Sequence, residues 1–396
     1  MLLFTLCITE QSNAEEGMGV ISLSVIYGTI ILSSMFLYSF GNLFPDGEPS
    51  LIATSAVLGL GGSPLWSAKC TYLTISGNAQ AEKENKKGQD IINQYFGLFF
   101  LIFQSSAVWG NLMSSLIFQQ DTNIAEIPEE RLQFCGAALC NENFTTSGNF
   151  TRPEQNLVNI LMGCYIGKQL ELPNISQGQG NQTFCSTFLA TFRLLGDKRL
   201  LMLIPLTMYS GFEQSFLAGE YTKNYVTCAI GIHYVGFVMI CFGAVNSLSS
   251  FSFGKLAQYT GRIPLFCLAA VINLSSAIAL LYWRPHPDEL PVFFVFPALW
   301  GVADAVWQTQ TNGAAFANYR MWESLGFVIA FAYSTFICLS TKLYILIAVL
   351  LLAMLTYFWV EYNEYKHPTP AVKRYADKLD LNDTEKKQNI ISQTRL

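Results

Sequence analysis

Charged residues are scarce in this 396-residue chain, because Asp, Glu, Lys and Arg make up 13% of it and hydrophobic residues make up 51%. Soluble domains carry roughly 25% charged residues, so too few are present here to cover a water-facing surface. The formal net charge of −5 gives no basic field for nucleic acid. These deficits exclude a soluble nucleic-acid-binding protein and indicate an integral membrane protein.

The residues needed for catalysis or metal binding are also sparse. The three histidines, at positions 233, 286 and 367, lie far apart, and none has a nucleophile and an orienting acid near it in the sequence. The ten cysteines include no CxxC pair and no Cys/His pair at metal-ligand spacing. We therefore expect no enzymatic activity, no metal site and no cofactor.

Long apolar runs are what the sequence does contain. A helix needs about 20 mostly apolar residues to cross a bilayer, and a window of that length predicts nine spanning helices. They lie near 18–40, 51–74, 94–118, 200–218, 226–253, 263–283, 290–310, 316–338 and 342–360. We expect an all-α polytopic membrane protein with four parts: an N-terminal bundle at 1–168, a polar linker at 169–199, a six-helix bundle at 200–360 and a disordered cytoplasmic tail at 361–396.

Lys and Arg in the short loops predict the orientation, because they favour the cytoplasmic side. Three lysines place the 75–93 loop in the cytoplasm, so the 119–155 loop faces the exterior. This exterior loop holds two N-glycosylation sequons, at Asn143 and Asn149, and the close pair Cys135 and Cys140, for which we expect a disulfide. Six crossings from residue 200 then return the C-terminus to the cytoplasm.

The N-terminal part fails this topology at a specific place. The only apolar stretch that can return the chain from the exterior loop to residue 193 is 157–167, LVNILMGCYIG, which spans roughly 16 Å as a helix and about half of the hydrocarbon layer. Two further sequons, at Asn174 and Asn181, follow on what should be the cytoplasmic side. An odd number of spanning helices is therefore missing from this part.

Several stretches resemble the unc-93 family, an atypical branch of the major facilitator superfamily. They include EEGMGVISLSVIYG, NQYFGLFFLIFQSSAVWGNLMSSL, FPALWGVADAVWQTQ and AAFANYRMWESLGFVIAF. The resemblance implies a twelve-helix fold of two bundles and a role in channel regulation or trafficking rather than established transport. This chain departs from the family pattern near 1–6, 41–50, 157–167 and 311–316, which leads to the hypothesis of a splice-shortened isoform with an incomplete N-terminal bundle.

The loop GKLAQYTGR at 254–262 has Gly254 and Gly261 framing a turn that carries Lys255 and Arg262. It is similar to a degenerate form of the superfamily's gating loop, in which basic residues pair with helix ends and carboxylates. An ordinary positively charged cytoplasmic loop explains the same residues, and both interpretations stay open here.

Asp304 lies in an apolar run, where a carboxylate is costly unless a neighbour satisfies it. Gln308 shares its helical face, and the next predicted helix brings Arg320 and Glu323. One hypothesis is an Asp304–Arg320 ion pair that holds two helices together. The other is a proton-coupling or cation site that Asp304 forms with Glu213.

Two classes of function follow. The first is a non-catalytic accessory protein that binds a membrane protein, by resemblance a potassium channel subunit, in the plasma membrane or, if partly retained, in the endoplasmic reticulum or endosomes. The second is a transporter that moves a small organic solute and couples through Asp304 or Glu213. Both classes need the lipid bilayer, and neither needs nucleic acid.

Glycosylation tests the predicted crossing at 157–167. We expect Asn143→Gln/Asn149→Gln to abolish the mobility shift on deglycosylation, and Asn174→Gln/Asn181→Gln to leave it unchanged, because sugar is added only on the luminal side. Immunoblots of the protein from cells measure this shift. A shift that shrinks in the second double variant contradicts the crossing.

Overall fold

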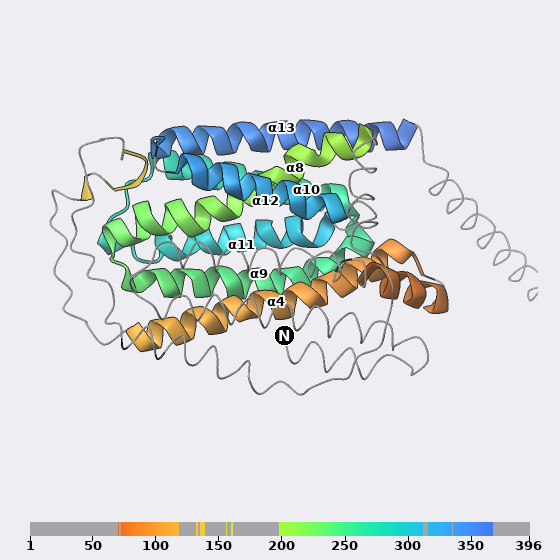
Figure 1. Cartoon of the computed structure of the whole chain (residues 1–396), viewed down its shortest axis with the longest axis horizontal. Helices are drawn as coiled ribbons and strands as arrows, with labels where there is room; N and C mark the ends of the chain where they lie inside the picture. The colour runs from red at the N-terminus through yellow and green to blue at the C-terminus, as the bar shows by residue number, and fades with distance from the viewer. Residues whose placement is uncertain are drawn as a thin grey trace, which may run out of the picture.

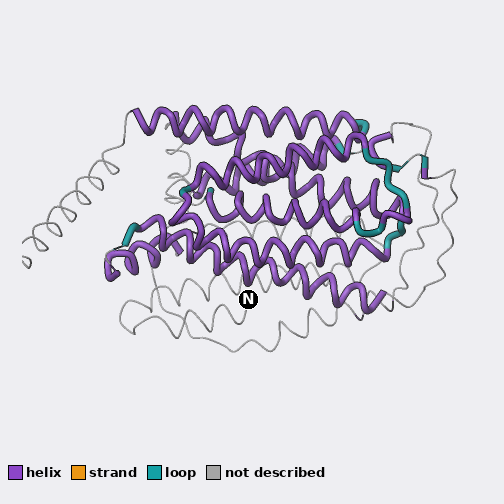
Figure 2. Tube along the Cα trace, turned by 180° about the vertical axis from the view of Figure 1, so that it is seen from behind, coloured by secondary structure: helices purple, strands orange, loops and turns teal. Residues whose placement is uncertain are grey.

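The computed structural model describes residues 73–84, 86–118, 198–311, 316–334 and 336–366, with short pieces at 70, 132–133, 135–138, 156 and 160. These residues form helices and turns with no strand among them, which confirms the all-α polytopic class. The labelled helices lie side by side along one direction, with α13 at one edge and α4 at the opposite edge (Figure 1, Figure 2). The predicted helix at 18–40, most of 51–74, the linker at 169–197 and the tail from 367 lie outside the described residues.

The structure describes seven labelled α-helices and three short helical elements. Their bounds are α4 Gly88–Phe118, α8 Lys198–Ser215, α9 His233–Thr260, α10 Arg262–Tyr282, α11 Val292–Gln310, α12 Phe316–Tyr333 and α13 Leu339–Lys366, and three short elements are η1 Gly136–Ala138, the π-helix η2 Phe216–Thr227 and η3 Pro287–Glu289. Of the described helices, α4, α9, α10, α11 and α13 are long and apolar enough to cross a membrane. The part of α12 from Met321 to Tyr333 is also apolar.

The start of α9 differs from the predicted segment at 226–253. The π-helix η2 continues α8 as far as Thr227, and α9 begins only at His233. Gly231 between them has a φ of 95°, a conformation that breaks a helix and that glycine adopts without steric cost. A hydropathy window misses this break because the residues around it, CAIGI, are apolar.

Helix α4 packs antiparallel along α9 through small side chains, which let the two backbones approach. A Cβ atom on Gly254 would lie 2.9 Å from the Gly97 Cα and from the Asn93 carbonyl oxygen. Further along, the Ser247 hydroxyl donates a hydrogen bond to the Leu101 carbonyl over 2.5 Å. This contact attaches a helix of the N-terminal part to the C-terminal helices.

Gly254 itself lies inside α9, which corrects the expectation that it frames a turn with Gly261. The helix continues to Thr260, and the turn consists of Gly261 alone, with a φ of 76°. Gly254 is needed where it stands because the backbone of α4 occupies the space of a side chain.

The disulfide expected between Cys135 and Cys140 is wrong. Cys135 pairs with Cys228, 93 residues further along the chain, over a Cα–Cα distance of 5.7 Å. Cys228 directly follows η2 and lies just before the break that precedes α9. The expectation failed because Cys228 falls inside the segment 226–253, which hydropathy assigned to the membrane.

The Gly254 contact predicts a sharp effect of a single methyl group. We expect Gly254→Ala to destabilise the protein by about 1–3 kcal/mol, because backbone atoms of α4 must move to admit it. Gly219→Ala is the control, because its Cβ would meet only the Phe331 ring, at 3.4 Å. Thermal unfolding of both purified variants measures the difference, and equal melting temperatures would show that α4 and α9 do not approach as described.

Candidate functional site

Asp304 on α11 is 1% exposed and accepts hydrogen bonds from amide side chains of three helices. The Nδ2 atom of Asn246 on α9 lies 2.5 Å from its carboxylate, and the Nε2 atom of Gln104 on α4 lies at 3.5 Å. Gln308, one turn along α11, donates over 3.5 Å. The carboxylate thus connects α4 with the C-terminal helices α9 and α11.

Gln308 links this centre to a second carboxylate, Glu323 on α12. Its Nε2 atom lies 3.3 Å from the Glu323 Oε1 atom, which also accepts from the Ser210 hydroxyl at 3.1 Å and the Gln214 amide at 3.2 Å. Ser210 and Gln214 belong to α8. The polar network therefore runs across five helices, from α4 to α8, and both of its carboxylates are buried.

Close helix crossings place Glu323 within reach of α8. A Cβ atom on Gly211 would collide with the backbone of α12 at Glu323 and lie 3.0 Å from the Phe327 nitrogen, and one on Gly326 would meet the Met208 carbonyl. Each glycine thus provides the space that the opposite helix fills. The network depends on this spacing because serine and glutamine side chains are short.

The predicted site residues divide into two groups. The structure brings together Asp304, Gln308 and Glu323, whereas the side chain of Arg320 lies outside the described residues, so its ion pair with Asp304 stays a prediction. Glu213 on α8 lies near Asp304, but neither of its carboxylate oxygens has a hydrogen-bond partner in the part of the chain that the structure describes. Of the three predicted carboxylates, Asp304 and Glu323 accept hydrogen bonds within the described network, whereas Glu213 does not.

The basic residues of the stretch 254–262 have no described hydrogen bond to this network. Lys255 lies over the Phe251 ring, with 4.4 Å from its Nζ atom to the ring centroid, and Arg262 begins α10 after Gly261. The gating interpretation stays a prediction. The sequons at Asn143, Asn149, Asn174 and Asn181, and Cys140, lie outside the described residues.

A second polar cluster, which sequence reasoning missed, lies on the π-helix η2. Glu220 forms a buried ion pair with Lys342 at the start of α13, over 2.7 Å. The carboxylate also accepts hydrogen bonds from the Ser334 hydroxyl at 2.5 Å and the Asn224 amide at 2.8 Å. A lone lysine in an apolar helix was a usable signal, since such a charge requires a partner at membrane depth.

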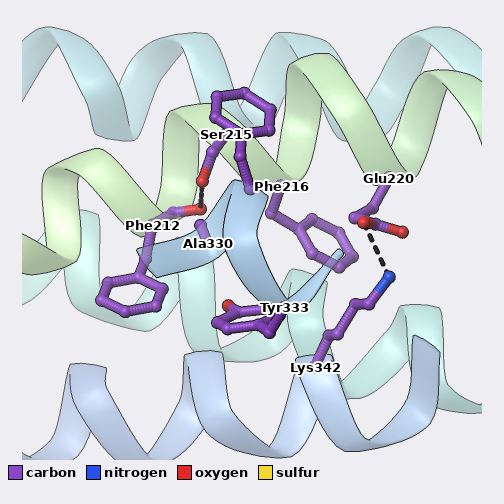
Figure 3. A pocket seen from close by; sticks show the side chains of 8 residues that line it. Phe212, Ser215, Phe216, Glu220, Ala330, Tyr333 and Lys342 are labelled. Carbon is purple, nitrogen blue, oxygen red and sulfur yellow. Dashed lines mark hydrogen bonds and ion pairs between the residues drawn. The ribbon is translucent and has the colours of Figure 1, made fainter. Parts of the chain in front are cut away.

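The ion pair lines a small pocket of about 230 Å³ of empty space, its open side included. In Figure 3 the Lys342 ammonium group points at the Glu220 carboxylate, and aromatic rings line the rest. The lining residues are Phe212, Ser215, Phe216, Glu220, Ala330, Phe331, Tyr333 and Lys342. Because the two charges satisfy each other and the pocket is small, the cluster fixes η2 against α13.

The chain is similar in sequence to a known protein family and to several of its members. The model of a family described as "Ion channel regulatory protein UNC-93" matches residues 21–358. "Protein unc-93 homolog A" of Danio rerio is 64% identical, over 100% of this chain and 97% of the relative, and the Homo sapiens protein of that name is 50% identical, over 90% and 88%. "Putative potassium channel regulatory protein unc-93" of Caenorhabditis elegans is 34% identical, over 82% of this chain and 50% of the relative.

The Danio rerio alignment also bears on the length of this chain. It runs over 454 positions against 396 residues here, so at least 58 positions of the alignment have no residue in this chain. This supports the hypothesis of a shortened form.

Lys342→Met tests the buried ion pair. We expect a loss of about 3–5 kcal/mol of stability, because Glu220 is left as an uncompensated buried charge. The double variant Glu220→Gln/Lys342→Met should regain most of this loss, while Lys366→Met at the exposed end of α13 should have little effect. Thermal unfolding of the four proteins measures how far the Glu220 change restores stability. A double variant that is no more stable than Lys342→Met would exclude the coupling between the two charges.

Proposed function

Because the chain belongs to the UNC-93 family of ion channel regulatory proteins, we propose that it is a multi-pass membrane protein that binds an ion channel subunit and changes the channel's activity or delivery, without catalysing a reaction. The observation that carries the proposal is the family match over residues 21–358, which includes all the helices of the polar network. The name of the Caenorhabditis elegans relative directs the proposal to a potassium channel.

The arrangement of the Asp304 network supports a scaffold. The Asp304 and Glu323 carboxylates are held by side-chain donors from neighbouring helices, so the network stabilises one packing of α4, α8, α9, α11 and α12. A regulator needs such a fixed surface to recognise its partner, because a rigid surface loses less conformational entropy on binding. The two carboxylates are therefore assigned a structural role within the regulatory protein.

The plasma membrane and a cytoplasmic C-terminus belong to the same proposal. The Cys135–Cys228 disulfide requires an oxidising compartment at the end of the helices where η2 meets α9. Helix α13 begins at Leu339, soon after Cys338, which also takes part in a disulfide, and runs toward the opposite end. Its C-terminal residue, Lys366, then faces the cytoplasm, in agreement with the positive-inside rule.

Co-expression with potassium channel subunits tests the proposal. We expect the current density at a fixed voltage to change when this chain is present, and the change to be lost with Asp304→Leu, which leaves Asn246 and Gln104 without their acceptor. Asp304→Asn is the matched variant, because it keeps the volume and one acceptor oxygen, and it should retain part of the effect. Whole-cell recording and surface biotinylation of the channel provide the readouts.

The opposite result has a distinct signature. Unchanged currents together with proton-dependent uptake of a solute that Asp304→Asn abolishes would replace the regulatory function with transport. Surface levels of each variant, measured in parallel, separate a loss of regulation from a failure to reach the membrane.

A further inference from the structure

A group of buried polar side chains without hydrogen-bond partners lies between α8 and α10, next to α11. Glu213 and Asn273 are both 0% exposed, and neither the carboxylate oxygens of the first nor the amide atoms of the second have a hydrogen-bond partner. The hydroxyls of Tyr209 and Ser276 are likewise buried without a partner. These four residues supply oxygen atoms that no described group satisfies.

Tyr209, Glu213 and Asn273 lie together, and Ser276 lies on the same face of α10 as Asn273. Glu213 follows Tyr209 by one turn of α8, and Ser276 follows Asn273 by one turn of α10. Asn273 lies beside both the Tyr209 hydroxyl and the Glu213 carboxylate. Residues one turn apart lie on the same helical face, so the faces of α8 and α10 that carry these groups approach at Asn273.

Aromatic rings of α11 enclose this region. The Trp307 ring lies 5.7 Å from the Tyr209 ring, centroid to centroid, and the Trp300 ring lies 5.8 Å from the Phe216 ring. Both indole rings are fully buried, and their N–H groups have no hydrogen-bond acceptor among the described residues. The polar atoms are therefore excluded from lipid and from bulk water.

Such an arrangement is costly unless something occupies it. Buried polar groups in folded proteins are hydrogen-bonded in the large majority of cases, and a buried charge requires a partner. Asp304, close by, meets this rule through Asn246, Gln104 and Gln308. Glu213 does not, which separates the two carboxylates that the sequence had grouped together.

We propose that Glu213, Asn273, Tyr209 and Ser276 form a binding site for a small monovalent cation. The Glu213 carboxylate, the Asn273 amide oxygen and the two hydroxyls are the hard oxygen ligands that such a cation prefers. One carboxylate balances one positive charge, since Asp304 is already held by N–H donors that repel a cation from its oxygens. The negative charge of Asp304 nevertheless strengthens the site from a distance.

The bound cation would hold α8 against α10. The Asp304 network joins α4, α8, α9, α11 and α12 and includes no side chain of α10 among the described hydrogen bonds. The cation then supplies the polar link that this network does not make to α10. The site is independent of any channel partner, so its failure would leave the regulatory function untouched.

The purified full-length chain in detergent tests the site directly. We compare its melting temperature, followed by tryptophan fluorescence, in chlorides of sodium, lithium, potassium and choline at equal ionic strength. We expect sodium to raise the melting temperature by about 3 °C over choline at concentrations well above the dissociation constant, because a cation that binds only the folded state stabilises it. Identical melting temperatures in all four salts overturn the proposal.

Variants assign the effect to these residues. Glu213→Gln removes the charge at nearly constant volume and should abolish the difference between sodium and choline, and Asn273→Ala should reduce it. Glu289→Gln is the matched control, because this exposed carboxylate contacts only Trp283 in the loop before α11 and its loss should leave the sodium effect intact.

Two results would contradict the assignment. A Glu213→Gln protein that keeps the full sodium effect places the cation elsewhere. The melting temperature of the unmodified protein could also change with pH but not with the cation. This result would show that Glu213 binds a proton and not a metal cation. If Glu213→Gln fails to fold, Asn273→Ala and the comparison of the four salts still test whether a cation binds at this site.

Discussion

The need to satisfy the Asp304 carboxylate inside an apolar bundle constrains much of the described structure. Its amide donors come from α4, α9 and α11, so these helices must meet at one depth. Side-chain amides are short, which is why the meeting helices approach through glycine: Gly97 and Gly254 between α4 and α9, and Gly211 and Gly326 where the network continues between α8 and α12. The hydrogen bonds of the buried polar groups therefore require the close packing of the helix backbones.

Sequence reasoning could find Asp304 because a carboxylate in an apolar run is conspicuous, and helical spacing correctly placed Gln308 beside it. Asn246 and Gln104 escaped notice, because uncharged amides are common in spanning helices and a single sequence carries no information on which helices touch. Cys228 was missed for a related reason. Its pairing depends on a helix break at Gly231 that hydropathy does not register, and chain proximity favoured Cys140 instead.

The Glu220–Lys342 pair could also be predicted only in part from the sequence. Lys342 stands alone at the start of an apolar helix, so its need for an anion was visible, yet the partner lies on a π-helix in a distant part of the chain. Element type and approximate bounds follow from apolar length, because each helix satisfies its own backbone. Contacts between helices depend on how the helices are placed against one another, and a single sequence does not contain this information.

The Cys135–Cys228 bond joins the loop that follows α4 to the end of η2 and closes a covalent ring of the chain between them. During synthesis this ring can close only after Cys228 has reached the oxidising compartment, so α8 and η2 must be made and inserted first. Once it is closed, a protease that cuts the chain between the two cysteines produces fragments that remain one molecule. The attachment of α4 to the C-terminal helices is then secured twice, by helix packing within the membrane and by a covalent bond outside it.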